Sequence, residues 1–104
     1  MPSDNFTVLV SPRADRKMAS HFQFLARVSE PAAGRLYDAY EEALGNLAEN
    51  PRGYPRYEPL SEIAAELHKK IFAKRYRIVF EIREDDVYIY DIQDCRQDID
   101  KSLV

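Results

Sequence analysis

Two kinds of hydrophobic pattern divide this chain. Up to about residue 50, apolar residues recur every three or four positions, which is typical of amphipathic helices. From residue 76 they alternate with polar residues, which is typical of strands with one buried face. Helices early in the chain and strands late in it predict an α+β fold.

The first predicted elements are a short strand and a helix. Residues 6–10 form a β-branched run that favours a strand. Ser11 and Pro12 follow, and this pair suits the N-cap and first position of a helix. An apolar stripe at helical spacing then predicts the buried side of that helix: Ala14, Met18, Phe22 and Leu25.

A second helix is predicted to begin at Ser29, where a hydroxyl cap precedes Glu30 and Pro31. Its apolar stripe consists of Leu36, Tyr40, Ala43, Leu44 and Leu47. Residues 50–53 contain a proline and a glycine and stop it. The short link between the two helices implies a helical hairpin. The acidic residues off the stripe are expected to be solvated: Asp38, Glu41, Glu42 and Glu49.

The middle of the chain is less regular. Residues 54–59 contain two prolines and are expected to form a loop. Residues 61–67 have the spacing for one or two helical turns, and strand character resumes at Lys70.

The last third of the chain predicts a hairpin of two strands. Residues 76–83 alternate apolar and polar, residues 84–86 form a polar break, and residues 87–92 are rich in β-branched and aromatic side chains. The complete prediction is an α+β domain with an N-terminal helical hairpin packed on one face of an antiparallel sheet.

Composition limits the class of protein. With 104 residues and 45% hydrophobic positions, the chain suits one domain covering residues 1–104. No apolar stretch approaches the ~20 residues that span a bilayer, and the N-terminus does not resemble a secretory signal, so we expect a cytoplasmic protein without membrane contact. Cys95, His21 and His68 have no metal-ligand spacing, and we expect no cofactor, no metal and no internal disulfide.

Charge is unevenly distributed along the chain. The formal net charge of −3 argues mildly against unassisted binding to nucleic acid. Acids dominate residues 30–66, whereas residues 69–83 carry a cluster of bases with one acid, Glu81. That cluster predicts a local positive field at one edge of the domain: Lys69, Lys70, Lys74, Arg75, Arg77 and Arg83.

Three segments resemble the RelE/ParE superfamily of bacterial toxin-antitoxin systems. They are residues 11–14 after the first strand, residues 31–36 (Pro-Ala-Ala-Gly-Arg-Leu), which look like the family's Pro-x-x-Ala-x-x-Leu helix with one position fewer between the proline and the alanine, and the strand Tyr-Arg-Ile-Val-Phe-Glu-Ile at 76–82 followed by the Arg-x-Asp segment at 96–98. The three segments occur in the order and at the spacing typical of the superfamily, and together they span nearly the whole chain.

The resemblance implies one of two activities. Members similar to RelE cut messenger RNA on the ribosome without a metal, using the RNA 2′-hydroxyl as the nucleophile, whereas members similar to ParE poison DNA gyrase without catalysis. Either kind is held inactive by a cognate antitoxin segment that folds on the toxin as a helix or an added strand. Candidate apolar contacts for that segment are Phe24, Tyr54 and Tyr57.

Metal-free RNA cleavage requires cations that stabilise charge on the scissile phosphate. The positions that match the RelE pattern are Arg77, Lys70 and Arg96, which are the candidate catalytic residues. Arg77 is expected on the strand face opposite Tyr76 and Ile78, where its guanidinium can meet a phosphate. The ordinary interpretation of Arg77 is a surface arginine paired with a carboxylate of the sheet, Glu81 or Asp91.

The other two candidates also have alternatives. Lys69 or Lys74 replaces Lys70 if the strand register slips by one residue. Arg96 is flanked by acids, so a salt bridge that holds the C-terminal segment is an equal interpretation.

The chain departs from the RelE pattern at two positions. Phe72 replaces a second basic residue, and Ile99 replaces a tyrosine after the Arg-x-Asp segment. Tyr88 or Tyr90 could take the tyrosine's role, although both suit packing on the sheet, and His68 could exchange a proton.

Three functional hypotheses follow. The first is a toxin that acts as a metal-independent endoribonuclease on messenger RNA, with the ribosome as partner. The second is a ParE-like inhibitor of DNA gyrase, which the negative net charge and the missing tyrosine favour. The third is a non-toxic module that only binds its antitoxin.

Overall fold

The structure, a computed structural model, describes residues 5–58 and 66–95. Its elements, in chain order, are β1 (Thr7–Val10), α1 (Pro12–Val28), α2 (Glu30–Glu49), a 3-10 turn η1 (Pro51–Gly53), β2 (Arg56–Tyr57), β3 (Leu67–Phe72), β4 (Tyr76–Arg83) and β5 (Asp86–Asp94). Among the described residues, no helix is both long enough and apolar enough to cross a bilayer.

Both helices begin where their capping residues predict. The Ser11 side chain accepts a hydrogen bond from the Ala14 backbone N–H, and the Ser29 side chain accepts one from the Ala32 N–H. Each cap satisfies a donor that the first helical turn leaves open. Since Ser29 is also the C-cap of α1, a single residue joins the two helices and forces the chain to reverse.

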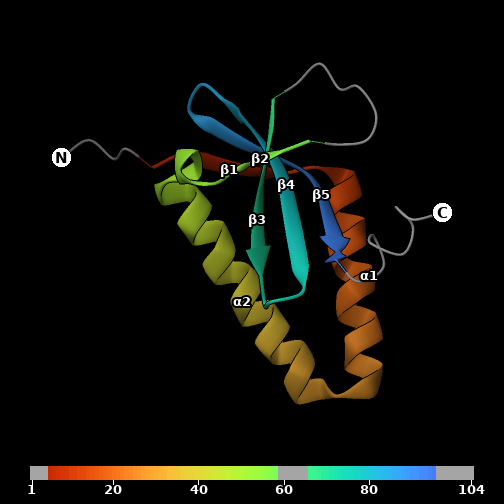
Figure 1. Ribbon diagram of the computed structural model, residues 1–104. Coiled ribbons are helices and arrows are strands. Elements are labelled where there is room, and N and C mark those ends of the chain that lie inside the picture. Colours follow the sequence, from red (N-terminus) through yellow and green to blue (C-terminus); the bar gives the residue numbers. More distant parts are fainter. Residues whose placement is uncertain (1–4, 59–65, 96–104) are drawn as a thin grey trace.

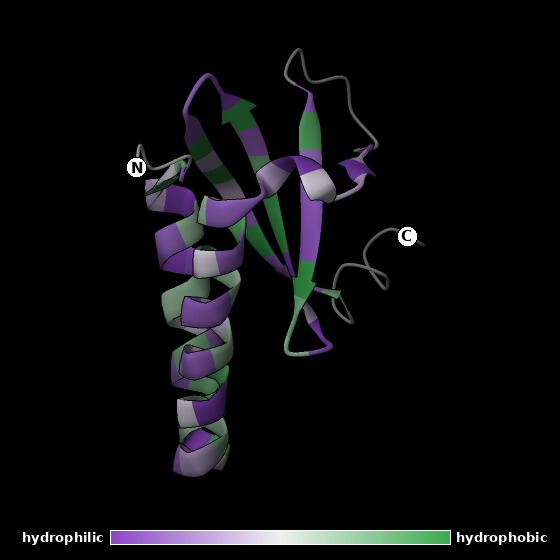
Figure 2. Ribbon diagram, turned by 90° about the vertical axis from the view of Figure 1, so that its left-hand side faces the viewer, coloured by the Kyte–Doolittle hydropathy of each residue, from purple (hydrophilic) through white to green (hydrophobic). Residues whose placement is uncertain are grey.

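The two helices pack side by side on one face of a five-stranded sheet, as Figures 1 and 2 show. We call this face of the sheet the inner face and the opposite one the outer face. The sheet has the order β1-β5-β4-β3-β2. Tyr76, Ile78 and Phe80 of β4 point inward, and the core of the protein lies between them and the helices.

The core joins both halves of the chain. Its buried members are Ala14, Met18, Leu36, Ala43, Leu47, Phe72, Tyr76, Ile78, Phe80, Val87, Ile89 and Ile92. Burying such side chains gives each of them roughly 1.5–3 kcal/mol relative to exposure. The early helical stripes and the late alternating strands therefore stabilise one another.

Strand β1 makes the sheet mixed. The pairs β2–β3, β3–β4 and β4–β5 are antiparallel, as predicted, but β1 pairs in parallel with β5, with Val8 opposite Val87. A parallel partner requires a long crossover connection, and here nearly the whole chain separates the two strands. Alternating polarity reveals which face of a strand is buried but not its neighbour, so the sequence did not predict this pairing.

The middle segment also differs from the prediction. Arg56 and Tyr57 form the short strand β2 inside the predicted loop, and strand β3 begins at Leu67, three residues before Lys70. Residues 59–65, which contain most of the predicted helical turns, lie outside the described residues.

The predicted hairpin of the last two strands is confirmed. Glu84 and Asp85 make a two-residue turn, and the strands pair from Arg83 opposite Asp86 onward. An irregularity at Val79 and Phe80, which face Asp91 and Ile89, leaves Tyr90 as an extra residue in β5. Such a bulge bends the strand and changes where the following side chains point.

Candidate functional site

Helix α1 and its N-cap Ser11 contact the edge of strand β5 beyond the point where its pairing with β1 ends. Beyond Ile89, no strand of the described residues pairs with β5 on this side, and exposed backbone groups there would need other partners. The Ser11 hydroxyl donates to the Tyr90 carbonyl at 3.0 Å. His21 Nε2 lies 3.2 Å from the Ile92 carbonyl oxygen, which can only accept, so this ring nitrogen carries the proton.

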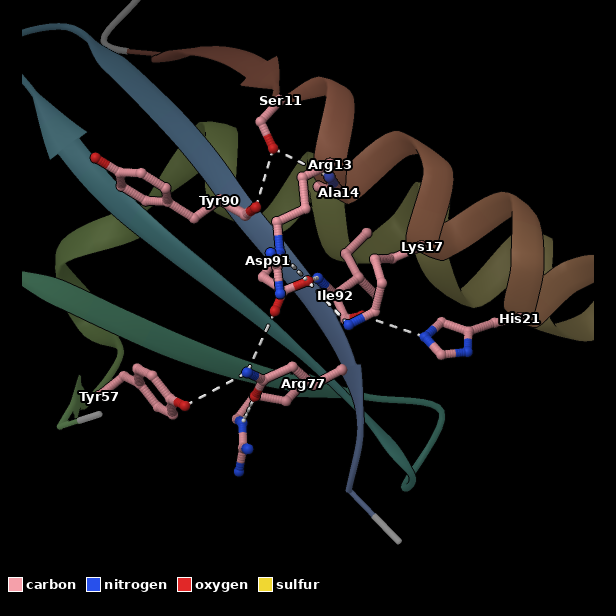
Figure 3. A network of polar contacts seen from close by, with 11 residues as sticks. Ser11, Arg13, Ala14, Lys17, His21, Tyr57, Arg77, Tyr90, Asp91 and Ile92 are labelled. Atoms are coloured by element: carbon pink, nitrogen blue, oxygen red, sulfur yellow. Dashed lines mark hydrogen bonds and ion pairs between the residues drawn. The ribbon is translucent and has the colours of Figure 1, made fainter. Parts of the chain in front are cut away.

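We call the contact between α1 and the edge of β5 the α1–β5 seam. Asp91 lies at its centre, as Figure 3 shows. Its Oδ1 accepts from the Ile92 backbone N–H at 2.9 Å and lies 3.3 Å from Lys17 Nζ and 3.5 Å from Arg13 Nε. The residue is 9% exposed. A carboxylate so buried needs these partners, and they fasten α1 to the sheet.

On the outer face, Arg77 contacts side chains of β5 and β2. Its Nε donates to Gln93 Oε1 at 2.7 Å, and its guanidinium carbon lies 5.1 Å from the centre of the Tyr57 ring. The Gln93 amide in turn lies 3.4 Å from both the Tyr57 hydroxyl and Asp91 Oδ2. A polar chain therefore runs from α1 through Asp91 and Gln93 to Arg77 (Figure 3).

Lys70 lies on the inner face of the sheet, opposite the face of Arg77. In the register of β3 and β4, Lys70 pairs with Ile78 and Ile71 pairs with Arg77. Its ammonium group lies 4.6 Å from the centre of the Tyr54 ring, a cation–π contact. The structure therefore does not bring Lys70 and Arg77 together on one surface.

The expected outward direction of Arg77 is confirmed by the same register, but its cross-strand partner is Gln93. The two carboxylates considered for it bind elsewhere: Glu81 pairs with Arg83, and Asp91 pairs with Arg13 and Lys17. Arg96, the third candidate, lies outside the described residues, as does Ile99.

An ion pair that the sequence did not predict closes the end of the sheet. Arg75 binds Asp94 with Nε and Nη2, the latter 2.8 Å from Oδ2, and Asp94 is 3% exposed. The hydrogen bond to Asp94 raises the pKa of Arg75. The sequence signal was an acid two residues past the β-branched and aromatic run at 87–92, and it becomes informative only once Tyr76 is known to face Asp94.

Tyr88 and Tyr90 are packed on the sheet with Arg83. Their rings meet edge to face at 5.1 Å, and the Arg83 guanidinium lies 4.5 Å from the Tyr88 ring centre. The Tyr90 hydroxyl accepts from Arg83 and donates to Glu81. These contacts explain the positions of both tyrosines on the sheet by packing and hydrogen bonding.

His68 links two segments. Its Nδ1 lies 3.2 Å from the Tyr54 carbonyl oxygen, and its Nε2 lies 3.3 Å from a Glu66 carboxylate oxygen. Its ring also stacks on Phe80 at 5.7 Å. Both nitrogens thus have structural contacts.

The apolar residues considered for an antitoxin contact differ in exposure. Phe24 is 60% exposed on α1. Tyr54 instead packs edge-on against Phe80, and Tyr57 lies under Arg77. Of these three, only Phe24 is a largely free apolar surface.

Tyr40 of α2 packs against the core and has a shifted pKa. Burial, with nearby Asp15 and Glu41, raises the pKa of Tyr40 to about 12, so this phenol stays neutral at physiological pH. Within residues 5–58 and 66–95, no three His, Cys, Asp or Glu side chains are arranged to hold a metal ion.

The fold and the α1–β5 seam define a small α+β protein in which a helical hairpin covers one face of a sheet. The family model for the ParE toxin of the type II toxin-antitoxin system parDE matches residues 8–99, and the chain belongs to this family. A solved structure of the chromosomal ParDE toxin-antitoxin system from P. aeruginosa shares the fold, with a TM-score of 0.68 and 12% identity over 88% of this chain and 98% of that one. No curated protein matches the sequence significantly.

Proposed function

We propose that this ParE-family toxin arrests growth by binding DNA gyrase, without cutting RNA or DNA, and that a cognate antitoxin holds it inactive. The observation that carries the proposal is the ParE family match over residues 8–99. Toxins similar to ParE inhibit gyrase as binding proteins, so they need a contact surface and no reactive group.

The arrangement of cations supports binding over cleavage. Cleavage of RNA by its own 2′-hydroxyl needs several donors aimed at one phosphate. Lys70 and Arg77 lie on opposite faces of the sheet, each over a tyrosine ring. Nothing among the described residues supports the ribonuclease hypothesis.

A basic hollow beside the β3–β4 turn suits the antitoxin. It has a volume of about 540 Å³, and Leu25, Leu36 and Tyr76 contribute apolar surface to it. Arg35, Lys74 and Arg75 also line it, and none of its described lining residues is acidic. An acidic amphipathic helix would place apolar side chains on this floor and carboxylates at this rim.

The activity can be tested on purified components. We expect the full chain to inhibit supercoiling of relaxed plasmid by DNA gyrase, and transcripts in a cell extract to stay intact at the same concentration. Cleaved transcripts with normal supercoiling would favour the ribonuclease instead.

Matched substitutions sharpen this test. We expect Lys70→Ala and Arg77→Ala to keep growth arrest on expression, because neither residue takes part in a reaction. A nuclease that used them as phosphate donors would lose ~10²-fold or more of its activity with each change. Loss of arrest with both variants, while both remain folded, would contradict the proposal.

The antitoxin hollow has its own test. The small acidic protein expected from the neighbouring reading frame should bind the wild-type chain. Arg35→Glu combined with Lys74→Glu should weaken that binding by at least ~10-fold, since like charges would then face each other across the hollow. Unchanged binding would place the antitoxin elsewhere on the toxin.

A further inference from the structure

The helical hairpin has a second hollow, on its side away from the sheet. This hollow measures about 340 Å³, and all its described lining residues belong to α1 or α2, including Met18, Phe22, Tyr37 and Tyr40. Phe22 and Tyr37 meet edge to face across the two helices, with ring centres 6.0 Å apart. Tyr37 is 50% exposed, so the aromatic pair at this surface is open to solvent.

The two helices that border the hollow carry opposite charge. Helix α1 has four Lys or Arg residues and one acid, Asp15, whereas α2 has five acids and one base, Arg35. Arg16 and Arg27 are exposed and eleven residues apart, which places them on one face of α1. Asp38 and Glu49 have the same spacing and exposure on α2.

These charges do not neutralise each other within the chain. Across residues 5–58 and 66–95, no ion pair joins Arg16 or Arg27 to a carboxylate of α2. Ion pairs elsewhere in the protein, such as Arg75 with Asp94, show that suitably placed charges do pair. The outer side of the hairpin therefore presents a basic row and an acidic row, separated by an apolar hollow.

Two glycines lie on the acidic row. Gly34 and Gly45 are eleven residues apart in α2, and a Cβ atom at either position would touch nothing within 4 Å. Glycine inside a helix costs roughly 0.5–1 kcal/mol relative to alanine. The folded chain has no steric need for them, but their missing side chains would let a second helix approach α2 closely.

We propose that two copies of this chain associate through the outer side of the hairpin, about a two-fold axis, with α1 of each copy against α2 of the other. In a two-fold interface the same surface meets itself, so that surface must carry both charges. The basic row of one copy then faces the acidic row of the other, twice. A uniformly acidic or basic partner would instead be repelled by one of the two helices.

Charge exchange between the helices provides the test. The first variant reverses the basic row with Arg16→Glu and Arg27→Glu, and the second reverses the acidic row with Asp38→Lys and Glu49→Lys. We expect the wild-type full chain to dimerise in sedimentation equilibrium. Each variant alone should dissociate at least ~10-fold more readily, because both contacts become repulsive. An equimolar mixture of the two should recover dimers, since opposite rows face each other again.

A control carries the charge change of the second variant, away from this surface. Glu58→Lys with Asp85→Lys alters two exposed acids outside the helices and should leave dimerisation at the wild-type level. Gly45→Ala should weaken dimerisation while the monomer keeps its fold by circular dichroism. A wild-type chain that stays monomeric up to ~1 mM, or variants that fail to recover when mixed, would overturn the proposal.

Discussion

The two faces of the sheet are built from different side chains. On the inner face, Ile78, Phe80 and Ile89 are completely buried against the helices. The outer face carries polar and aromatic pairs, such as Arg77 with Gln93, although its residues Leu67 and Val79 are also buried. The inner face therefore supplies most of the stability, and the outer face can vary its residues at a smaller cost.

Truncation of one large residue on each face tests this difference most strongly. Phe80→Ala should lower the free energy of unfolding by about 3–5 kcal/mol, because it leaves a cavity at the centre of the core. Ile71→Ala is the matched change on the outer face, where the side chain is 47% exposed, and should cost less than about 1 kcal/mol. Urea denaturation measures both, and similar losses would show that the two faces contribute alike.

Substitutions of Asp91 test how much the contact between helix α1 and strand β5 contributes to stability. Asp91→Ala should cost about 1–3 kcal/mol, since the Ile92 N–H loses its acceptor and Lys17 loses its counter-ion. Asp91→Asn keeps an oxygen for the N–H and should cost less. The comparison uses urea denaturation of both variants, and equal losses would mean that the charge alone matters.

On the inner side, the phenol of Tyr40 is expected to make the stability of the protein depend on pH. Its ring centre lies 5.7 Å from that of Phe72. Its pKa of about 12 in the folded protein exceeds the ordinary value of 10.0, so the folded state holds this proton more tightly than the unfolded state. The stability from this group is complete below pH 10 and is lost as pH rises toward 12.

The measurement is the free energy of unfolding across that pH range. Wild type should lose stability more steeply than Tyr40→Phe, which has no phenolic proton. Parallel curves for the two proteins would rule out Tyr40 as the source of the pH dependence.

Signals that act over a few residues predicted the structure well. The capping serines, Ser11 and Ser29, begin the two helices as expected because a cap depends only on the next three residues. The alternation from Tyr76 onward placed Arg77 on the outer face because strand periodicity is also local.

Features that depend on distant partners could not be predicted. Lys69 and Lys70 are adjacent, so polarity alone did not tell which of them points inward, and the pairing of Lys70 with Ile78 decides it. Gln93 faces Arg77 only because a bulge at Tyr90 shifts the register of β5. The sequence therefore predicted the direction of the Arg77 side chain correctly, but it did not predict that Gln93 would be its partner on the neighbouring strand.

The contact between Arg77 and Gln93 is the smallest effect and the most specific to the outer face. A double-mutant cycle with Arg77→Ala and Gln93→Ala should give a coupling energy of about 0.5–1.5 kcal/mol, as expected for one partly exposed hydrogen bond. The same cycle with Arg83→Ala and Gln93→Ala is the control. Its coupling should be near zero, because the register places Arg83 at the other end of the hairpin, opposite Asp86. Equal coupling in both cycles would mean that Gln93 stabilises the sheet as a whole and does not orient the Arg77 guanidinium.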